Sequence, residues 1–501
     1  IVAALICLAG ASQAEGPVGF RVHDLRDPSR TFETWPDEGS SFSAAAASRP
    51  MRIFEWYPAI DGASGDTANP TRLTWADYVV FEHDDAYLSA SPRSADPLPE
   101  TKREAILARY VERSARRYEI AEAKVEALLA RPTTAAWNRA PRPGQHPVVI
   151  ARTMPMSIGL LAEHLAARGY VVLAPAHLAP HSWQHLDFVP NPQSLDTDIR
   201  DLQFVAARLP ELPHVDPDRV AAAAFSSGTL PQLLWQMRDL RLRALVALEG
   251  WERFEAGVPV LEASPWYRPT ALRVPHLLVE KAAEESNPSY AKSDTVLGAA
   301  VYARRERVTF EAASHGSFLS AARWFAGERP DDPSGAIHDC TLGVVTDFFD
   351  RHLKGVPPVA EKRIECRSAH TVDVREAAAP RPTEDELARL IERGEIERAA
   401  AILFAEGAPP DGLYRRRALR RVAQSLLDDS SKLEASRLIS RLFPASAWAW
   451  IDVANACEAL ADEAGRLEAV RRALAALDDD ADVSEERRPR LRTALREQLG
   501  G

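Results

Sequence analysis

Between residues 147 and 312, short and continuously apolar segments alternate with amphipathic ones, and this pattern constrains the fold more than any other feature of the chain. Such apolar segments, separated by helices, are typical of strands in a parallel sheet that helices cover on both faces. The sequence therefore predicts an α/β fold. The expected strands are VVIA (148–151), YVVLAP (170–175), VAAAA (220–224), ALVALE (244–249), HLLVE (276–280) and VTFEA (308–312).

Two segments precede this region. FRVHDL and MRIFEWYPA, within residues 17–58, carry β-branched and aromatic residues and predict a hairpin. Residues 60–146 are expected to form a helical insertion. In it, Thr101 and Glu104 have capping-box spacing at the start of a charged helix that runs to about Arg131. Pro132 and the Pro-rich stretch after it are expected to end that helix.

A second domain is expected at the C-terminal end, because 501 residues exceed one ordinary core. After a predicted helix at 342–353, the Ala- and Pro-rich segment AAAPRPTEDE is typical of a linker. The α/β domain is placed at 17–372 and an all-helical domain at 383–501. In the latter, LARLIERGEIERAAAIL and WAWIDVANACEALADEAGRLEAVRRALAAL each predict two helices joined by a turn. They resemble tetratricopeptide-type repeats, although degenerate helical hairpins fit almost as well.

The first residues predict export. IVAALICLAGASQAEG combines an apolar run with the small-x-small pattern Ser12-Gln13-Ala14, so residues 1–14 are expected to be part of a signal peptide and the protein to be secreted or periplasmic. No other segment is apolar and long enough to predict a membrane span. A net charge of −11 argues against a nucleic-acid partner.

Three cysteines would follow the signal peptide. In an oxidising compartment, Cys340 and Cys366 are candidates for a disulfide between the last helix of the α/β domain and the strand-like segment after it. Cys457, in an expected helix among Ala and Leu, is interpreted as a buried free thiol. The cysteine spacing predicts no zinc site.

The strongest chemical signal is Ala224-Phe225-Ser226-Ser227-Gly228, which lies between an expected strand and an expected helix. It is the nucleophile-elbow pattern G-x-S-x-G with Ala in place of the first Gly. A sharp turn there exposes the serine hydroxyl and directs the next backbone N–H at the oxygen that becomes negative in acyl transfer. We therefore predict Ser226 as a nucleophile and the Ser227 N–H as an oxyanion donor.

A serine nucleophile needs a base, and the fold places that base after the nucleophile. His315, in the loop after the last expected strand, is the best candidate, although a helix-capping role is the alternative. His276 opens a strand and His338 begins a late helix, so both are less well placed. A third possibility, metal binding by residues spaced four apart, is disfavoured because Pro180 interrupts the helix that would align them; these are His177, His181 and His185.

The orienting carboxylate has two candidate positions. Glu249 ends the strand ALVALE, whereas Glu284 and Glu285 lie in the loop after the next strand. Both positions are at the carboxyl ends of strands, where open α/β sheets bind ligands. A strand-end salt bridge is the alternative role for Glu249.

Taken together, these residues carry a family resemblance. PVGFRVHDLRDPSR, WYPA, PVVIA, LAEHLAARGYVVLAPAH, VDPDRVAAAAFSSG and VALEGW resemble the platelet-activating-factor acetylhydrolase and dienelactone-hydrolase-like esterases, which have the α/β-hydrolase fold. The resemblance covers roughly 17–355, with the insertion only loosely matched. It implies that Glu249, in Leu248-Glu249-Gly250-Trp251, is the acid and that His315 is the base.

The chain departs from the family in the loop after the first core strand. There the family has a glycine-rich loop that supplies the second oxyanion donor, whereas this chain has Ala151-Arg152-Thr153-Met154-Pro155-Met156. Met154 is the best match for the donating N–H, because Pro155 has none. Losing one such donor typically costs about 10²–10³ in rate.

Two functions are therefore compatible with the sequence. The first is a serine esterase that cleaves a small-molecule or lipid ester with Ser226, His315 and Glu249, and that needs no cofactor or metal. The second is a weakened or inactive hydrolase-fold scaffold that binds a protein partner through its C-terminal helices. An intact Ser–acid–His order favours the first, and the atypical loop favours the second.

Overall fold

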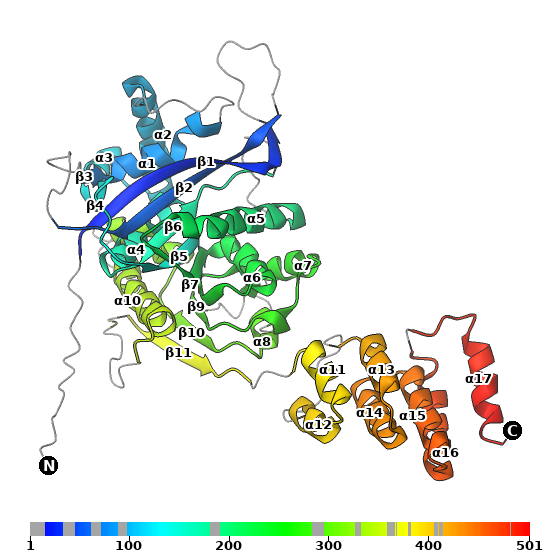
Figure 1. Ribbon diagram of the computed structural model, residues 1–501. Coiled ribbons are helices and arrows are strands. Elements are labelled where there is room, and N and C mark those ends of the chain that lie inside the picture. The colour runs from blue at the N-terminus through cyan, green and yellow to red at the C-terminus, as the bar shows by residue number, and fades with distance from the viewer. Residues whose placement is uncertain are drawn as a thin grey trace, which may run out of the picture. The chain divides into compact units, whose positions relative to one another are not determined.

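The computed structural model comprises two compact units, Ile1–Ala377 and Ala378–Gly501 (Figure 1). Residues 1–14, for which a signal peptide is expected, and also His181, His185, Glu284 and Glu285, lie outside the residues that the structure describes. The described residues are 16–33, 46–61, 72–88, 98–180, 191–282, 295–325, 332–357, 366, 368–378, 382–404, 409, 414–480 and 482–500.

The first unit is built on an 11-stranded sheet with the order β11-β10-β9-β8-β7-β5-β6-β2-β1-β4-β3. Its central strands β6, β5, β7, β8, β9 and β10 are parallel to one another, while β1 and β2 form the antiparallel hairpin expected from the sequence. The strands are β1 (Val18–Glu33), β2 (Ala46–Pro58), β3 (Arg72–Thr74), β4 (Pro132–Trp137), β5 (His146–Arg152), β6 (Val171–Pro175), β7 (Val215–Phe225), β8 (Leu242–Leu248), β9 (His276–Lys281), β10 (Arg305–Phe310) and β11 (His370–Arg375).

Helices cover both faces of this sheet, as Figure 1 shows for α4 and α10 on one face and α5 and α6 on the other. Alternate residues of β5 enter different cores: Val149 packs in the cluster under α4 and α10, and Val148 packs in the cluster under α5 and α6. The predicted α/β-hydrolase fold class is confirmed. The helices are α4 (Pro155–Ala167), α5 (Pro192–Arg208), α6 (Thr229–Arg238), α7 (Gly257–Glu262), α8 (Thr295–Ala299), α9 (Ser320–Phe325) and α10 (Ser334–Leu353).

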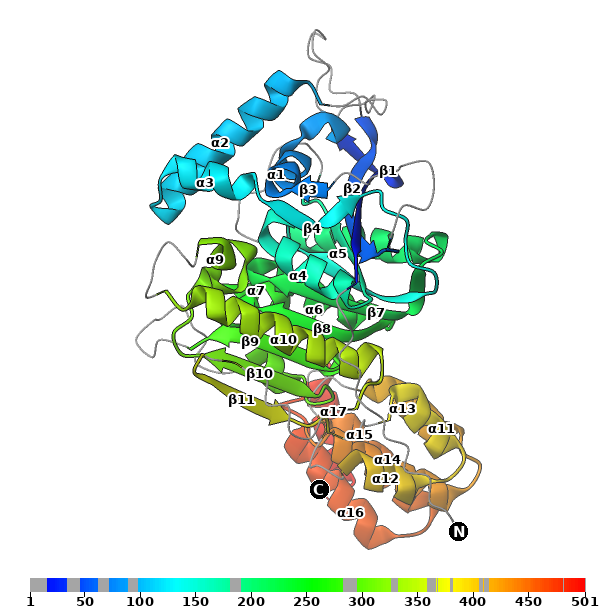
Figure 2. The ribbon, with the colours of Figure 1, turned by 90° about the vertical axis from the view of Figure 1, so that its left-hand side faces the viewer.

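The insertion contains α1 (Trp75–His83), α2 (Glu100–Tyr118) and α3 (Glu122–Leu129), which lie beside β3 and β4 at one end of the sheet (Figure 2). The prediction of a single helix from Thr101 to Arg131 is wrong, because α2 and α3 occupy this range. Pro99 is the N-cap of α2, and the helix ends because Glu119 adopts a left-handed φ of 55°. The Pro-rich stretch also begins with a strand, β4, which pairs with β1 and β3.

The disulfide considered from the sequence is present between Cys340 of α10 and Cys366, just before β11. It closes a loop onto the edge strand, since β11 pairs antiparallel with β10. The expected domain end at residue 372 falls inside β11, so the first unit extends past it.

The second unit consists of helices in its described residues and has its own apolar clusters. Both expected helix–turn–helix pairs are present, as α11 with α12 and as α15 with α16. Cys457 is a buried free thiol in α15. The helices are α11 (Glu384–Glu392), α12 (Ile396–Phe404), α13 (Arg416–Ser425), α14 (Asp429–Leu442), α15 (Ala447–Ala459), α16 (Glu463–Ala476) and α17 (Arg488–Glu497).

Candidate active site

The candidate residues follow the carboxyl ends of neighbouring parallel strands. Ser226 follows β7, Glu249 follows β8, and His315 lies in the loop after β10. Because parallel strands end at the same edge of a sheet, residues far apart in the chain meet there. Ser226 and His315 line one cavity of about 530 Å³.

Ser226 lies in a sharp turn between β7 and α6. Its φ is 54°, a conformation that non-glycine residues adopt rarely and at a cost of about 1–3 kcal/mol. The turn also lies close to the end of β5: a Cβ on Gly228 would lie 2.7 Å from the backbone oxygen of Arg152. The glycine at the end of the motif is therefore explained by the close approach of the β5 end to the elbow.

Glu249 and His315 are in contact. Glu249 Oε2 lies 3.1 Å from His315 Nδ1, which is the contact expected from the sequence. The Glu249 side chain is fully buried, and its other oxygen accepts hydrogen bonds from Arg253 Nη1 at 2.8 Å and from the backbone N–H of Lys281 at 3.1 Å. A buried carboxylate that is held by three donors has a fixed orientation. The imidazole of His315, by contrast, is about half exposed, at 48%.

The loop between β5 and α4 forms another part of the cavity wall. Met154 lines the cavity and is the N-cap of α4, Pro155 is the first residue of that helix, and the N–H of Met156 donates to Glu82 Oε2 at 3.0 Å. Pro155 lacks an N–H and that of Met156 is used, so the expectation that the Met154 N–H is the second donor stays a prediction. Burial raises the pKa of the Glu82 carboxyl to about 7.

The buried hydroxyl of Thr229 contacts the backbone of the elbow. Thr229 Oγ1 is 2.8 Å from the backbone oxygen of Ser226 and 2.5 Å from Glu252 Oε2, and it accepts from the N–H of Trp251. A hydroxyl has one proton to donate. If Thr229 donates it to Ser226, the short contact with Glu252 requires a protonated carboxyl. Burial raises the pKa of Glu252 to about 7, which agrees with that arrangement.

A second polar cluster also lines the cavity. Asp198 Oδ1 accepts from Arg152 Nη2 at 2.8 Å and lies 3.1 Å from His177 Nδ1. Burial raises the pKa of Asp198 to about 6. The cavity wall also contains apolar Phe225, whose ring centroid is 4.8 Å from that of His315.

Two of the alternative histidines, His276 and His338, do not line this cavity, whereas His177 does. His276 opens β9 and His338 lies within α10; both are buried, and burial lowers their pKa values to about 4. His177 lies in a loop, as expected. Among the described residues, no group of three or more His, Cys, Asp or Glu side chains is arranged to hold a metal ion.

Several residues of the site were not predicted from the sequence. Arg253 and Glu252 fall in the turn Trp251–Arg253, and Thr229 begins α6. Arg253 follows Glu249 by four residues, the spacing of a helical ion pair, but no helix was expected there. Thr229 and Glu252 carry no local signal because their contact depends on how α6 packs against the turn after β8.

No family model and no curated protein matches the chain. Among solved structures, the chain is similar to a ferulic acid esterase from Streptomyces cinnamoneus, with 20% identity over 72% of this chain and 96% of that one, and a TM-score of 0.46.

Proposed function

We propose that this protein is a serine hydrolase that cleaves carboxylic esters through an acyl-enzyme. One observation carries the proposal: Ser226, in a left-handed turn, lines the same cavity as His315, whose Nδ1 lies 3.1 Å from the buried Glu249 carboxylate. Nucleophile, base and orienting acid are the three groups that acyl transfer by serine requires.

In the proposed reaction, Ser226 Oγ attacks the ester carbonyl carbon while His315 Nε2 takes the hydroxyl proton. The same nitrogen then gives this proton to the leaving alkoxide as the C–O bond breaks. A water molecule repeats the sequence on the acyl-enzyme and releases the acid. Glu249 keeps the Nδ1–H tautomer and stabilises the imidazolium. The Ser227 N–H, and that of Met154, hold the oxyanion.

The cavity lining favours an ester with an apolar part and a polar part. Leu195, Phe225 and Leu319 supply apolar surface, and the exposed Arg117 of α2 supplies a positive charge. Because α2 belongs to the insertion, we infer that residues 60–146 contribute to substrate selection. The resemblance to acetylhydrolase-type and dienelactone-hydrolase-like esterases remains a prediction.

We also propose that the protein is exported, as the sequence of residues 1–14 predicts. The Cys340–Cys366 disulfide supports this, because disulfides persist in oxidising compartments. Within the described residues, no helix is both long and apolar enough to cross a membrane.

A fluorophosphonate probe, which labels activated serines, tests the proposal. Wild-type protein is expected to be labelled, and Ser226→Ala is expected to lose all labelling while it keeps its fold by circular dichroism. Ser227→Ala is the matched control, because its proposed role uses the backbone N–H, which the substitution leaves in place. A series of p-nitrophenyl esters from short to long acyl chains then defines the substrate class.

Two results would contradict the proposal. Labelling that persists in Ser226→Ala would assign the nucleophile elsewhere. No labelling and no ester turnover in the folded wild-type protein would favour the scaffold alternative, which the glycine-free loop 151–156 motivates.

A further inference from the structure

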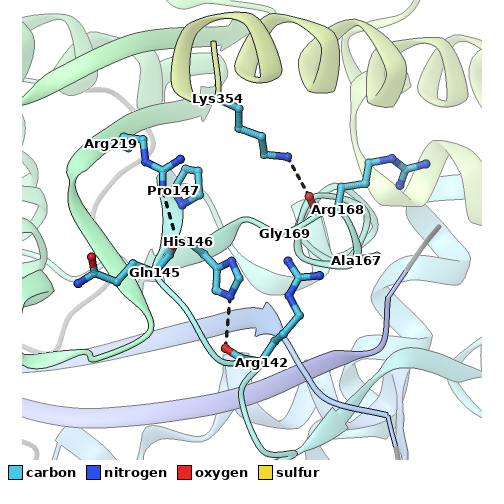
Figure 3. Close-up of a pocket in the computed structure, with 9 residues that line it drawn as sticks. All are labelled: Arg142, Gln145, His146, Pro147, Ala167, Arg168, Gly169, Arg219 and Lys354. Carbon is cyan, nitrogen blue, oxygen red and sulfur yellow. Dashed lines mark hydrogen bonds between the residues drawn. The ribbon is translucent and has the colours of Figure 1, made fainter. Parts of the chain in front are cut away.

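A second cavity lies at the opposite edge of the sheet from the candidate active site. It has a volume of about 450 Å³ and is formed where β5 begins, where α4 leads into β6, and where α10 ends. Figure 3 shows its lining: Arg142, Gln145, His146, Pro147, Ala167, Arg168, Gly169, Arg219 and Lys354. We call it the basic pocket, because four of these nine residues are arginine or lysine.

The basic pocket is distant from the proposed chemistry. His146 begins β5 and lines the basic pocket, whereas Arg152 ends the same strand and lines the catalytic cavity. Seven residues of strand span about 20 Å. Likewise, Arg219 lies near the start of β7 and Ser226 follows its end. A ligand in the basic pocket would therefore not contact the catalytic residues.

Some of the positive charge is compensated within the chain. Arg219 Nε pairs with Asp216 at 2.5 Å, and Lys354 Nζ pairs with Asp350 at 2.8 Å. These pairs hold the two cations in place: Lys354 also donates to the backbone oxygen of Arg168 at 2.9 Å, and Arg219 donates to that of Gln145 at 3.2 Å. Two fixed cations at the rim of one cavity are preorganised for an anion.

Arg142 is not compensated in this way. Its side chain is exposed, and its guanidinium lies against Gly169, where a Cβ would be 2.8 Å from Arg142 Nη2. Gly169, with φ 92°, therefore leaves the space that this guanidinium occupies. No carboxylate among the described residues pairs with Arg142.

The cations act on one another electrostatically. The pKa of Lys354 is lowered, first by burial and then by the charges of Arg142 and Arg219, despite the opposing effect of Asp350. The pKa of His146 is lowered by burial and by the same two arginines. The positive charges are thus close enough to disfavour one another, and an anion between them would relieve that repulsion.

We propose that the basic pocket binds a phosphate group with two or more negative charges. Guanidinium groups bind phosphate oxygens in pairs, and an ammonium adds a point charge. Arg142, Arg219 and Lys354 approach the cavity from three different elements, which suits a tetrahedral group with several oxygens better than a planar carboxylate. The volume admits a ligand larger than one phosphate, so a free phosphorylated compound and a phospholipid headgroup share the required chemistry.

Isothermal titration of the full chain with pyrophosphate, at constant ionic strength, tests the proposal. We expect one saturable site that Arg142→Gln weakens by about tenfold or more, the loss typical of a charge-assisted contact. The double variant Arg142→Gln/Arg219→Gln is expected to abolish binding. Arg421→Gln, which removes the same charge from an exposed position of α13, is the matched control and is expected to bind like wild type.

Co-sedimentation with phosphatidylcholine vesicles, with and without phosphatidic acid, distinguishes the two sources of phosphate. Binding only to vesicles that contain phosphatidic acid assigns a lipid headgroup, and binding of pyrophosphate assigns a free phosphorylated ligand. The proposal is overturned if neither probe binds, or if Arg142→Gln binds as well as wild type. Since Arg142 is exposed, its variant remains informative even if the double variant fails to fold. Arg142→Gln is expected to be labelled by the fluorophosphonate probe like wild type. A failure of the phosphate-binding proposal can therefore be distinguished from a failure of the proposed esterase.

Discussion

The buried carboxyl behind the nucleophile elbow makes a sharp prediction about stability and pH. Glu252 is 3% exposed, and its Oε2 contacts Thr229 Oγ1. Burial raises its pKa from 4.5 to about 7. Between these two values the folded chain binds a proton that the unfolded chain has released. The free energy of unfolding contributed by Glu252 is therefore present in full below pH 4.5 and decreases as the pH rises to 7.

The size of the effect follows from the same two pKa values. Each pH unit between them changes stability by about 1.4 kcal/mol, so the total loss is about 3.5 kcal/mol. Glu252→Gln keeps a neutral hydrogen-bonding group of nearly the same size beside Thr229, but the amide does not titrate. Glu82, whose pKa is also raised to about 7, contributes equally to both proteins and cancels in their difference.

Urea denaturation of wild type and Glu252→Gln at pH 5, 6, 7 and 8 measures this difference. We expect the variant to gain on wild type by about 2.5 kcal/mol from pH 5 to pH 8. Glu255→Gln, the same substitution at an exposed position three residues later, is expected to run parallel to wild type. Parallel curves for wild type and Glu252→Gln would refute the argument that this carboxyl is protonated in the folded chain.

Two other predictions concern the architecture. Replacing Cys340 and Cys366 by Ser is expected to lower the free energy of unfolding by about 3–4 kcal/mol, because the disulfide closes a loop with a sequence separation of 26. Cys457→Ser, which removes the free thiol, is the control. An unchanged urea midpoint in the double variant would contradict this prediction. A chain that ends after Ala377, at the boundary between the two units, is expected to fold and to keep hydrolysis of small esters, and a folded but inactive product would show that the C-terminal helices shape the site.

The central fold could be predicted from the sequence because each parallel strand is recognisable from its own residues. The continuously apolar segments correspond to β5 to β10, because strands that are buried on both faces carry apolar residues on both sides. The insertion was harder to predict. Glu119 ends α2 through a left-handed turn without Gly or Pro nearby, and β4 is defined by pairing with β1 and β3 rather than by its composition.

The same distinction applies to the site. Ser226 was recognisable because strand, turn and helix follow one another in the chain. Glu249 lies at a strand end, as Glu284 and Glu285 were expected to, and was preferred because Leu248-Glu249-Gly250-Trp251 resembles the esterase family. Arg253 and Glu252 could not be recognised, because their importance depends on residues that they contact only in the folded chain. Arg253 hydrogen-bonds to the Glu249 carboxylate, and Glu252 contacts the Thr229 hydroxyl. Supporting contacts between elements that are distant in sequence leave no periodic pattern.

Backbone conformation provides the strongest link between the fold and the proposed chemistry. Ser226 and Glu249 both have left-handed φ values, 54° and 51°, although neither is glycine. The two residues preceding them, Phe225 and Leu248, are paired in register across β7 and β8. The strain therefore occurs at the same level of two adjacent strands, and the packed sheet must hold both turns against a cost of about 1–3 kcal/mol each. A hydroxyl and a carboxylate held in strained turns side by side, one in the same cavity as His315 and the other in contact with it, are what the proposed nucleophile site requires. A scaffold that only binds a partner gains nothing from either turn.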